Sequence, residues 1–297
     1  MTVGDGRGGG ATAGALHIVS TPIGNLADLS PRAVAVLGEV RLVLAEDSRV
    51  ARVLLSSIGV TSETASLPGF DESDRIAPII ARLLQGEAVA LISDAGTPLI
   101  SDPGQHLVRT AISAGIRIIP IPGASALLAA VVASGVAGPR WNFEGFLPRG
   151  GSDRRRVIGA LAADERASVI YEAGNRVAET LRELAEAAGS DRPAALCREL
   201  TKLHEEVRRG GLAELAALVE SGAIDGRGEF VIVLGETQDV ASEPDADGAY
   251  PAALAAVEQR MAEGASRSDA VRGIASEWKL NRRRLWSLAH RDAAEGE

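Results

Sequence analysis

Two aspartates, eight residues apart, are the side chains whose type and spacing first suggest a binding site in this chain. They lie in ISDAGTPLISDPG, residues 92–104, where the phrase Ile-Ser-Asp-x-Gly occurs twice. Asp94 follows an apolar, strand-like run, and open parallel sheets bind ligands beyond the carboxyl ends of their strands. Gly96, two residues later, allows a close approach of backbone to a ligand. We therefore predict that Asp94 faces a small-molecule pocket, the alternative being an Asx-turn that stabilises the loop.

Asp102 has a different local context. It precedes Pro103 and the apolar-periodic segment QHLVRTAISAG, residues 105–115. A capping residue followed by proline is typical of a helix start, and Gly115 is typical of a helix end. The sequence therefore predicts that Asp102 is a helix N-cap and that the two aspartates have different roles.

Three more loops follow predicted strands and carry polar or breaker residues. They are TPIGN (21–25), EDSR (46–49) and PGAS (122–125). Ser125 is expected at a helix N-terminus, where free N–H groups favour an anion such as a carboxylate; the alternative is a plain N-cap. No G-x-G-x-x-G fingerprint follows a predicted strand, and there is no P-loop motif. The four histidines are scattered, so no metal site is expected.

The elements that would position these loops alternate between strand-like and helix-like segments. The chain has 297 residues, of which 46% are apolar and 3% aromatic. This composition suits about two domains whose cores are built from Ala, Val, Leu and Ile. Alternation of strands and helices predicts right-handed crossovers and an open parallel sheet, so the fold class is α/β. The expected strands of the first domain are 16–20, 40–45, 88–93 and 116–121.

The segment GPRWNFEGFLPRGGSDRRR, residues 138–156, interrupts this alternation and marks the predicted domain boundary. A second alternating region follows, with strands expected at 167–172, 194–200 and 229–236. An acidic, breaker-rich segment then predicts a linker. The expected organisation is a disordered glycine-rich tail (1–14), an N-terminal α/β domain (15–137), a C-terminal α/β domain (138–237), a linker (238–249) and a small helical, helix-turn-helix-like extension (250–297).

Charge and cysteine content limit the partners and the compartment. The net charge of −9 argues against a generic nucleic-acid binder, so any RNA must be met by local basic clusters. The candidates are Arg149, Arg154, Arg155 and Arg156, with Arg282, Arg283 and Arg284 beside Trp278 and Trp286. The alternative is a solvated helix face with its tryptophans packed inward, which we favour for the tryptophans. The single cysteine, Cys197, fits a reducing cytoplasm, and no apolar run is long enough to span a membrane.

Taken in order, VSTPIGNLADLS, AEDSR, ISDAGTPLISDPG, PIPGASA, FEGFLPR and RELTK resemble the small-subunit ribosomal RNA methyltransferase I family of the tetrapyrrole-methylase superfamily. The likeness covers about residues 16–236, and the C-terminal helical segment is also similar. The resemblance implies two α/β domains of the class III methyltransferase type, with S-adenosylmethionine bound in the cleft between them. It also implies a homodimer that 2′-O-methylates the ribose of a cytidine in the decoding region of 16S rRNA.

The resemblance also implies positions for the cofactor contacts. By motif, these are Ile23, Asp94, Thr97, Ser125, Ala126 and Tyr171, and the same loops add Pro22, Gly24 and Gly96. The chain departs from the family pattern at two places where a histidine is common, near Asp71 and at Asn175. Roles assumed for those histidines are therefore not carried over.

Methyl transfer from a sulfonium to a hydroxyl is an in-line displacement, which benefits from orientation and from a base that accepts the hydroxyl proton. The candidate catalytic residues are Glu46, Asp47, Arg49, Glu199 and Lys202. Each could instead form a surface ion pair, and Lys202 would need a lowered pKa to act as a base. Two alternative functions stay open: a methyltransferase acting on carbon atoms of a corrin or porphyrin ring, and a non-enzymatic nucleic-acid-binding protein.

Overall fold

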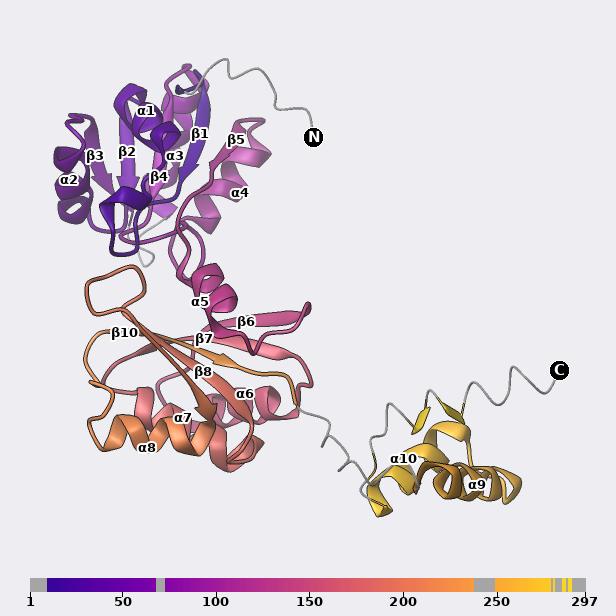
Figure 1. Ribbon diagram of the computed structural model, residues 1–297. Helices are drawn as coiled ribbons and strands as arrows, with labels where there is room; N and C mark the ends of the chain where they lie inside the picture. Colours follow the sequence, from indigo (N-terminus) through magenta and orange to yellow (C-terminus); the bar gives the residue numbers. More distant parts are fainter. Residues whose placement is uncertain are drawn as a thin grey trace. The chain divides into compact units, whose positions relative to one another are not determined.

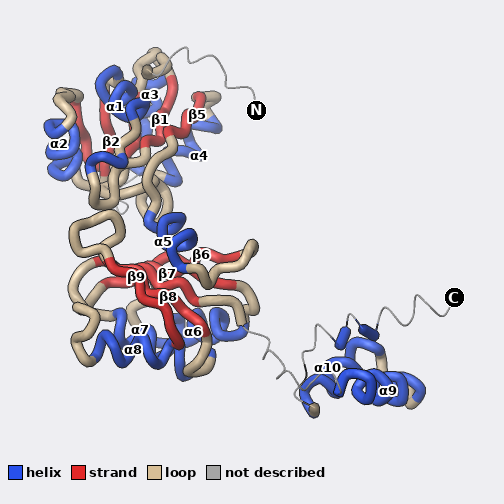
Figure 2. Tube along the Cα trace, in the orientation of Figure 1, coloured by secondary structure: helices blue, strands red, loops and turns tan. Residues whose placement is uncertain are grey.

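The structure is a computed structural model that describes residues 10–67, 73–237, 249–278, 280, 285–286 and 288–289. The chain forms two compact units with their boundary between residues 236 and 237. The first unit holds two five-stranded sheets with helices around them, and the described part of the second is helical (Figures 1 and 2).

The first sheet is parallel throughout, as the alternating pattern predicts. Its strands are β1 (Ala15–Val19), β2 (Leu42–Ala45), β3 (Glu63–Ser66), β4 (Val89–Ile92) and β5 (Arg117–Ile121), in the order β3-β2-β4-β1-β5. One face is covered by α1 (Pro31–Glu39) and α2 (Ser48–Ser57), and the other by α3 (Ser73–Leu84) and α4 (Gln105–Ser113). A short 3-10 helix, η1 (Leu26–Asp28), precedes α1. The carboxyl ends of all five strands consequently meet at one edge.

The predicted start of α1 is confirmed. Ser30 is the N-cap, and its Oγ accepts a hydrogen bond from Ala33 N at 3.1 Å. Pro31 occupies the first helical position, where its missing N–H is not needed. The loop between β1 and α1 therefore ends at a capped helix start.

The second sheet is mixed. Its strands are β6 (Trp141–Phe146), β7 (Ala167–Ala173), β8 (Pro193–Arg198), β9 (Glu206–Gly211) and β10 (Glu229–Leu234), in the order β6-β7-β10-β8-β9. β6 and β7 pair in parallel, and the other three pairs are antiparallel. Successive side chains of a strand point to opposite faces, so this sheet has two separate apolar cores. One core packs under α6 (Gly151–Ala163), α7 (Val177–Ala188) and α8 (Leu212–Glu220).

The other face of the second sheet is covered by α5 (Ala126–Ser134). Leu127 and Ala130 of this helix pack with Val169, Val231 and Val233. α5 precedes the domain boundary expected at residue 138, yet it packs against the second sheet. The helix that begins at the edge of the first sheet thus extends across the face of the second (Figure 1).

Three observed strands, β3, β6 and β9, are absent from the sequence-based prediction. All three lie at sheet edges. β6 and β9 fall in segments that were expected to be the domain boundary and a connection. Their side chains are mostly half-buried or exposed, which weakens the apolar alternation that signals a strand.

The second unit contains α9 (Ala249–Ala262) and α10 (Arg267–Glu277) around a small core of its own. Trp278 and Trp286 are 40% and 36% exposed, so neither ring has the full inward packing that we favoured from the sequence. Arg282, Arg283 and Arg284 lie outside the described residues, as do Asp71, residues 1–9 of the expected tail and residues 238–248 of the expected linker. Across the described ranges, no helix is long and apolar enough to cross a membrane.

Candidate functional site

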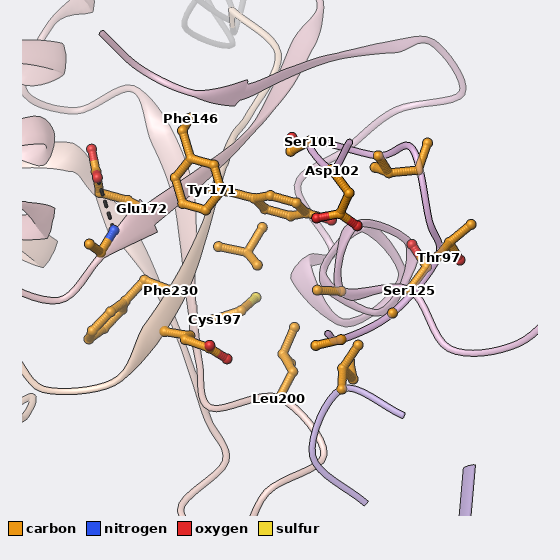
Figure 3. Close-up of a pocket in the computed structure, with 18 of the residues that line it drawn as sticks. Thr97, Ser101, Asp102, Ser125, Phe146, Tyr171, Glu172, Cys197, Leu200 and Phe230 are labelled. Atoms are coloured by element: carbon orange, nitrogen blue, oxygen red, sulfur yellow. Dashed lines mark hydrogen bonds between the residues drawn. The ribbon is translucent and has the colours of Figure 1, made fainter. Parts of the chain in front are cut away.

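A cavity of about 420 Å³ opens between the carboxyl-end loops of the first sheet and the second sheet (Figure 3). This volume lies within the range of small-molecule sites. One wall comes from residues 94–97 and 100–102 with Ile23, and the N-terminus of α5 adds Ser125 and Ala126. The opposite wall comes from the second sheet and includes Phe146, Tyr171, Cys197, Leu200 and Phe230.

Backbone and hydroxyl hydrogen bonds join the three loops of the first wall. Thr21 and Gly96 exchange backbone hydrogen bonds of 2.8 and 3.1 Å, which link the loops after β1 and β4. Thr97 Oγ1 donates to Ala124 O at 3.0 Å and lies 3.1 Å from Ser20 Oγ. β4, β1 and β5 are neighbours in the sheet, so their loops reach each other without distortion.

The structure brings most of the expected cofactor residues to this cavity. Those that line it are Ile23, Asp94, Gly96, Thr97, Ser125, Ala126 and Tyr171. Pro22 and Gly24 lie outside the lining. A Cβ at Gly24 would meet Lys202 Cγ and would lie 3.0 Å from Thr201 Oγ1. Gly24 therefore allows loops from the two sheets to touch.

The N-cap role expected for Asp102 is wrong. α4 begins three residues later, at Gln105, with Gly104 as its N-cap and no side-chain capping bond. Leu99 and Ser101 have φ values of 73° and 70°, and Gly104 has 113°, so the loop turns in the left-handed region before the helix begins. This conformation raises the free energy of non-glycine residues, and residues strained in this way are often found at ligand sites. Asp102 instead lines the cavity, next to Ser101.

Burial changes the acid–base behaviour of Asp102. Desolvation, reinforced by the charges of Glu46 and Asp94, raises the pKa of its carboxyl to about 6, although a hydrogen bond with Ser93 opposes the shift. Partial burial and the charges of Asp94 and Asp47 also raise the pKa of Glu46. One rim of the cavity therefore concentrates negative charge that water solvates poorly.

The catalytic candidates Glu46, Asp47 and Arg49 lie outside the lining. Asp47 caps α2 by accepting from Arg49 N at 2.8 Å, and its carboxylate also binds the Arg49 guanidinium, with Nη2–Oδ2 at 2.7 Å. These hydrogen bonds lower the pKa of Asp47 to about 2. Its backbone N–H also donates to Asp94 Oδ1 at 3.1 Å. Asp47 and Arg49 thus form the ion pair that was the alternative interpretation, and Asp47 helps to position Asp94.

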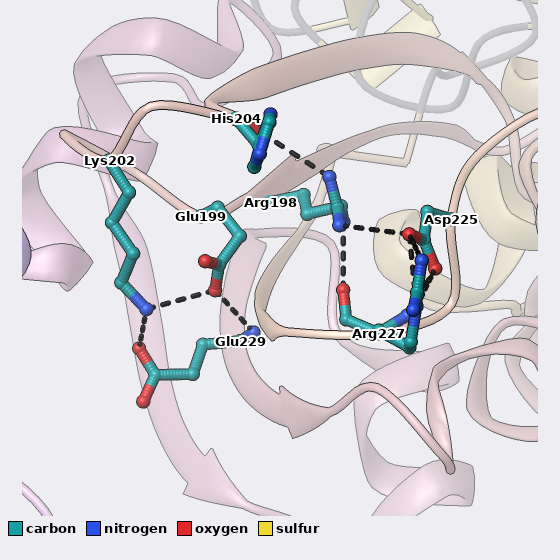
Figure 4. A network of polar contacts seen from close by, with 7 residues as sticks. All are labelled: Arg198, Glu199, Lys202, His204, Asp225, Arg227 and Glu229. Atoms are coloured by element: carbon teal, nitrogen blue, oxygen red, sulfur yellow. Dashed lines mark hydrogen bonds and ion pairs between the residues drawn. The ribbon is translucent and has the colours of Figure 1, made fainter.

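Glu199 and Lys202 also lie outside the lining, in an ion-pair network that includes Glu229 of the cavity wall (Figure 4). Lys202 Nζ donates to Glu199 Oε1 at 2.9 Å and to Glu229 Oε2 at 2.8 Å. Burial lowers the pKa of Lys202, but the hydrogen bonds to Glu229 and Glu199 outweigh it and the net shift is upward. Lys202 is therefore charged, and the neutral base considered for it is wrong. Its network holds the loop that carries Leu200 to the cavity.

Tyr171 is fixed within the second wall. Its hydroxyl accepts a hydrogen bond from Leu127 N, in the first turn of α5, at 3.1 Å. The rings of Phe143 and Phe146 meet the Tyr171 ring edge to face, with centroids 4.9 and 5.6 Å away. Motif position pointed to Tyr171, whereas Phe146 was missed, although it lies in the quoted segment FEGFLPR.

Arg154 does not belong to the exposed basic cluster that was expected to contact RNA. Its side chain is 5% exposed and binds Glu183, with Nη2–Oε2 at 2.6 Å, and Thr180 Oγ1 at 2.8 Å. Thr180 Oγ1 in turn donates to the buried Glu172 at 2.7 Å. Arg149, Arg155 and Arg156 are exposed. The expected RNA contact of Arg154 is therefore wrong, because this side chain joins α6 to α7.

Within the described part of the chain, no group of three or more His, Cys, Asp and Glu side chains is arranged to hold a metal ion. The chemistry available to the cavity comes from the carboxyl groups of Asp94, Asp102, Glu172 and Glu229, a helix N-terminus, hydroxyl groups, the Cys197 thiol and aromatic rings.

The family and the individual proteins that this chain matches agree with each other. The family described as Tetrapyrrole (Corrin/Porphyrin) Methylases matches residues 15–216. A protein of Xylella fastidiosa named ribosomal RNA small subunit methyltransferase I is 49% identical over 75% of this chain and 82% of its own. A Synechocystis protein of the same name is 40% identical over 95% of this chain and 100% of its own.

Solved structures share the fold at low identity. Uroporphyrin-III C-methyltransferase of Thermus thermophilus, complexed with S-adenosyl homocysteine, aligns with a TM-score of 0.53 at 20% identity. The alignment covers 75% of this chain and 97% of that one. This likeness concerns the fold alone.

We predict that Arg154→Met lowers the free energy of unfolding by roughly 1 to 3 kcal/mol, because Thr180 and Glu183 lose a buried charged partner, although Arg176 stays 3.3 Å from the buried Glu172. Arg155→Met, on the exposed side of the same helix, should change it by less than about 0.5 kcal/mol. Denaturant unfolding of both variants checks this. Equal stabilities would contradict the structural role of Arg154.

We also predict that Asp102→Asn stabilises the free protein. The pKa of Asp102 in the fold, about 6, lies above its ordinary value of 3.8, so the folded state loses stability as pH rises through this window. The variant should be more stable than the wild type at pH 8, by on the order of 2 kcal/mol, and the difference should vanish near pH 4. Unfolding curves across this range measure it, and a variant less stable at pH 8 would contradict the assignment.

Proposed function

The chain belongs to the tetrapyrrole methylase family, and from this premise we propose that it 2′-O-methylates the ribose of a cytidine in the decoding region of 16S rRNA. It is an S-adenosylmethionine-dependent methyltransferase. The relatives that match most of its length are named for small-subunit ribosomal RNA, which supports this substrate over a tetrapyrrole. The single structural observation that carries the proposal is the cavity between the two sheets, with Asp94 and Asp102 on one wall.

The cavity fits the methyl donor, which supplies an activated methyl group on a positively charged sulfur. Asp94 and Asp102 present carboxylates to a cationic ligand, and such a ligand would relieve the cost of desolvating Asp102. Ser125 is the N-cap of α5 but makes no capping bond through its side chain, so first-turn N–H groups other than that of Leu127, which donates to Tyr171, are available to a carboxylate. Ile23, Leu200 and Val231 supply apolar surface. These positions remain our proposal for the donor site.

The residues of the chain assist transfer chiefly by orientation and by excluding water. A ribose hydroxyl is a weak nucleophile, so a base that accepts its proton would assist the transfer once both partners are fixed. Of the five nominated catalytic residues, Asp47, Arg49, Glu199 and Lys202 are held in ion pairs. Glu46, whose pKa is raised, stays our candidate for the base.

RNA would reach the cavity along exposed arginines. Arg149, Arg155 and Arg156 follow β6, which carries Phe146 at the cavity wall, and the proposal extends to Arg282–Arg284 by sequence alone. An acidic chain must concentrate its positive charge in this way to meet phosphates. We propose the assembled small subunit as the substrate and the cytoplasm as the compartment, with no metal required.

The homodimer is also part of the proposal. α5 is apolar on all sides, and Leu128 and Val132 of its outer face are 53% and 82% exposed. An exposed apolar face of this kind favours contact with a second surface. A second copy of the chain is the partner we propose.

The function is tested by incubating the purified protein and labelled S-adenosylmethionine with unmodified small ribosomal subunits, with naked 16S rRNA and with uroporphyrinogen. We expect label in the ribosomal RNA, at a ribose that becomes resistant to alkaline cleavage. Label confined to the tetrapyrrole would overturn the proposed substrate. Binding of RNA without any transfer would favour a non-enzymatic role.

The donor site has its own test. We predict that Asp102→Asn and Asp94→Asn each weaken S-adenosylmethionine binding about 10- to 100-fold, because each removes a charge-assisted contact. Wild-type affinity should also fall as pH drops below about 6, where Asp102 becomes protonated. Asp153→Asn, on the exposed start of α6, is the matched control. Calorimetric titration that found unchanged affinity for both cavity variants would contradict these roles.

A further inference from the structure

We propose that Phe146 is the platform on which the base of the acceptor nucleotide stacks. This inference rests on the proposed function and names a substrate-binding residue for it. Two observations support it. The exposed ring of Phe146 lies at the wall of the cavity, and the pairing register of its strand, β6, shifts just before it.

A β-bulge determines where this ring points. Phe143 pairs with Val169 and Phe146 with Tyr171, so three residues of β6 advance against two of β7. In a regular strand, residues three apart point to opposite faces. The extra residue turns Phe146 onto the face of Phe143, Val169 and Tyr171, which is the cavity face. Bulges next to active sites commonly re-aim a side chain in this way.

Gly145 makes the bulge possible. Its φ of 73° lies in the left-handed region, and a Cβ there would be 2.9 Å from Ser101 Oγ of the opposite wall. Both features exclude a larger residue without rearrangement. The strained loop of Asp102 and the bulge of β6 thus meet at the same edge of the cavity.

The exposure of Phe146 is costly for the fold alone. The side chain is 57% exposed, whereas Leu147, the next residue, is buried. Burying an aromatic ring would stabilise the protein, and the chain has only nine aromatic residues in total. Exposure of one of them at a cavity wall is explained if a ligand covers it.

The support beneath the ring is rigid. Tyr171, which Phe146 contacts at 5.6 Å between centroids, is anchored by its hydrogen bond to Leu127 N and is packed by Phe143 from another side. Figure 3 shows the rings of Phe146 and Tyr171 side by side at the cavity, with Asp102 near the far end of Tyr171. A ring held in this way can receive a planar partner at little entropic cost.

A nucleobase is the planar partner that the reaction supplies. An RNA nucleotide that enters the cavity leaves its stack, and unstacked bases bind on aromatic side chains. Arg149 follows Phe146 by three residues and is exposed, so a phosphate of the same strand has a cation within a short stretch of chain. Stacking does not distinguish bases strongly, so the platform would orient the nucleotide rather than identify it.

The test uses the full-length protein, labelled S-adenosylmethionine and unmodified small ribosomal subunits. Phe146→Ala, Phe146→Leu and Phe146→Trp are compared with the wild type and with Ile112→Ala. Ile112 lies on α4, is 60% exposed and is outside the cavity lining, so it matches the exposure of Phe146. Donor affinity by calorimetry and thermal unfolding are recorded for every variant.

We expect Phe146→Ala and Phe146→Leu to lower kcat/KM for subunits about 5- to 140-fold, mainly through KM, with donor affinity within twofold of wild type. Phe146→Trp should restore most of the activity, and Ile112→Ala should behave as wild type. Activity of Phe146→Ala within twofold of wild type would overturn the inference. So would equal activity of the Leu and Trp variants, or a parallel loss of donor binding, which would place the ring in the donor site. A wild type that transfers no label to subunits would instead refute the proposed function, and the inference with it.

Discussion

A parallel sheet brings the loops after all its strands to one edge, and the cavity depends on this constraint. The loops after β1, β4 and β5 bond to each other through Thr21, Gly96 and Thr97, and the second sheet closes over them. Closure removes water from Asp102 and raises its pKa, so the free fold carries a cost that a cationic ligand would relieve. The strained loop of Leu99 and Ser101 and the bulge at Gly145 are two further local costs at the same place.

The first sheet and its loops could be predicted because their signals are local. β1, β2 and β4 are buried on both faces and are apolar throughout apart from His17 in β1, which is typical of central parallel strands. Asp94 is the second polar residue after the apolar run of β4, and this position predicts that it lies at the carboxyl end of the strand. Ser30 with Pro31 likewise specifies a helix start without help from distant residues.

What could not be predicted depends on distant contacts. β3, β6 and β9 are edge strands with one partner each, so polar residues and glycines such as those of EVRRGG are tolerated. Asp102-Pro103 has the local pattern of a cap, but the left-handed backbone of Leu99, Ser101 and Gly104 delays the helix to Gln105. Arg154 is different, because helical spacing was sufficient. It lies three, four and seven residues before the buried Val157, Ile158 and Leu161, so it shares their face, whereas Arg155 has such a spacing only to Ile158.

The central claim is that the cavity between the two sheets holds a positively charged methyl donor against the carboxylates of its first wall. A crystal structure of the protein grown with S-adenosylmethionine tests it most directly. We expect the ligand between the loop of residues 94–102 and Tyr171, with its carboxylate at the N-terminus of α5. Ligand density elsewhere on the molecule, with this cavity empty at saturating concentration, would contradict the account.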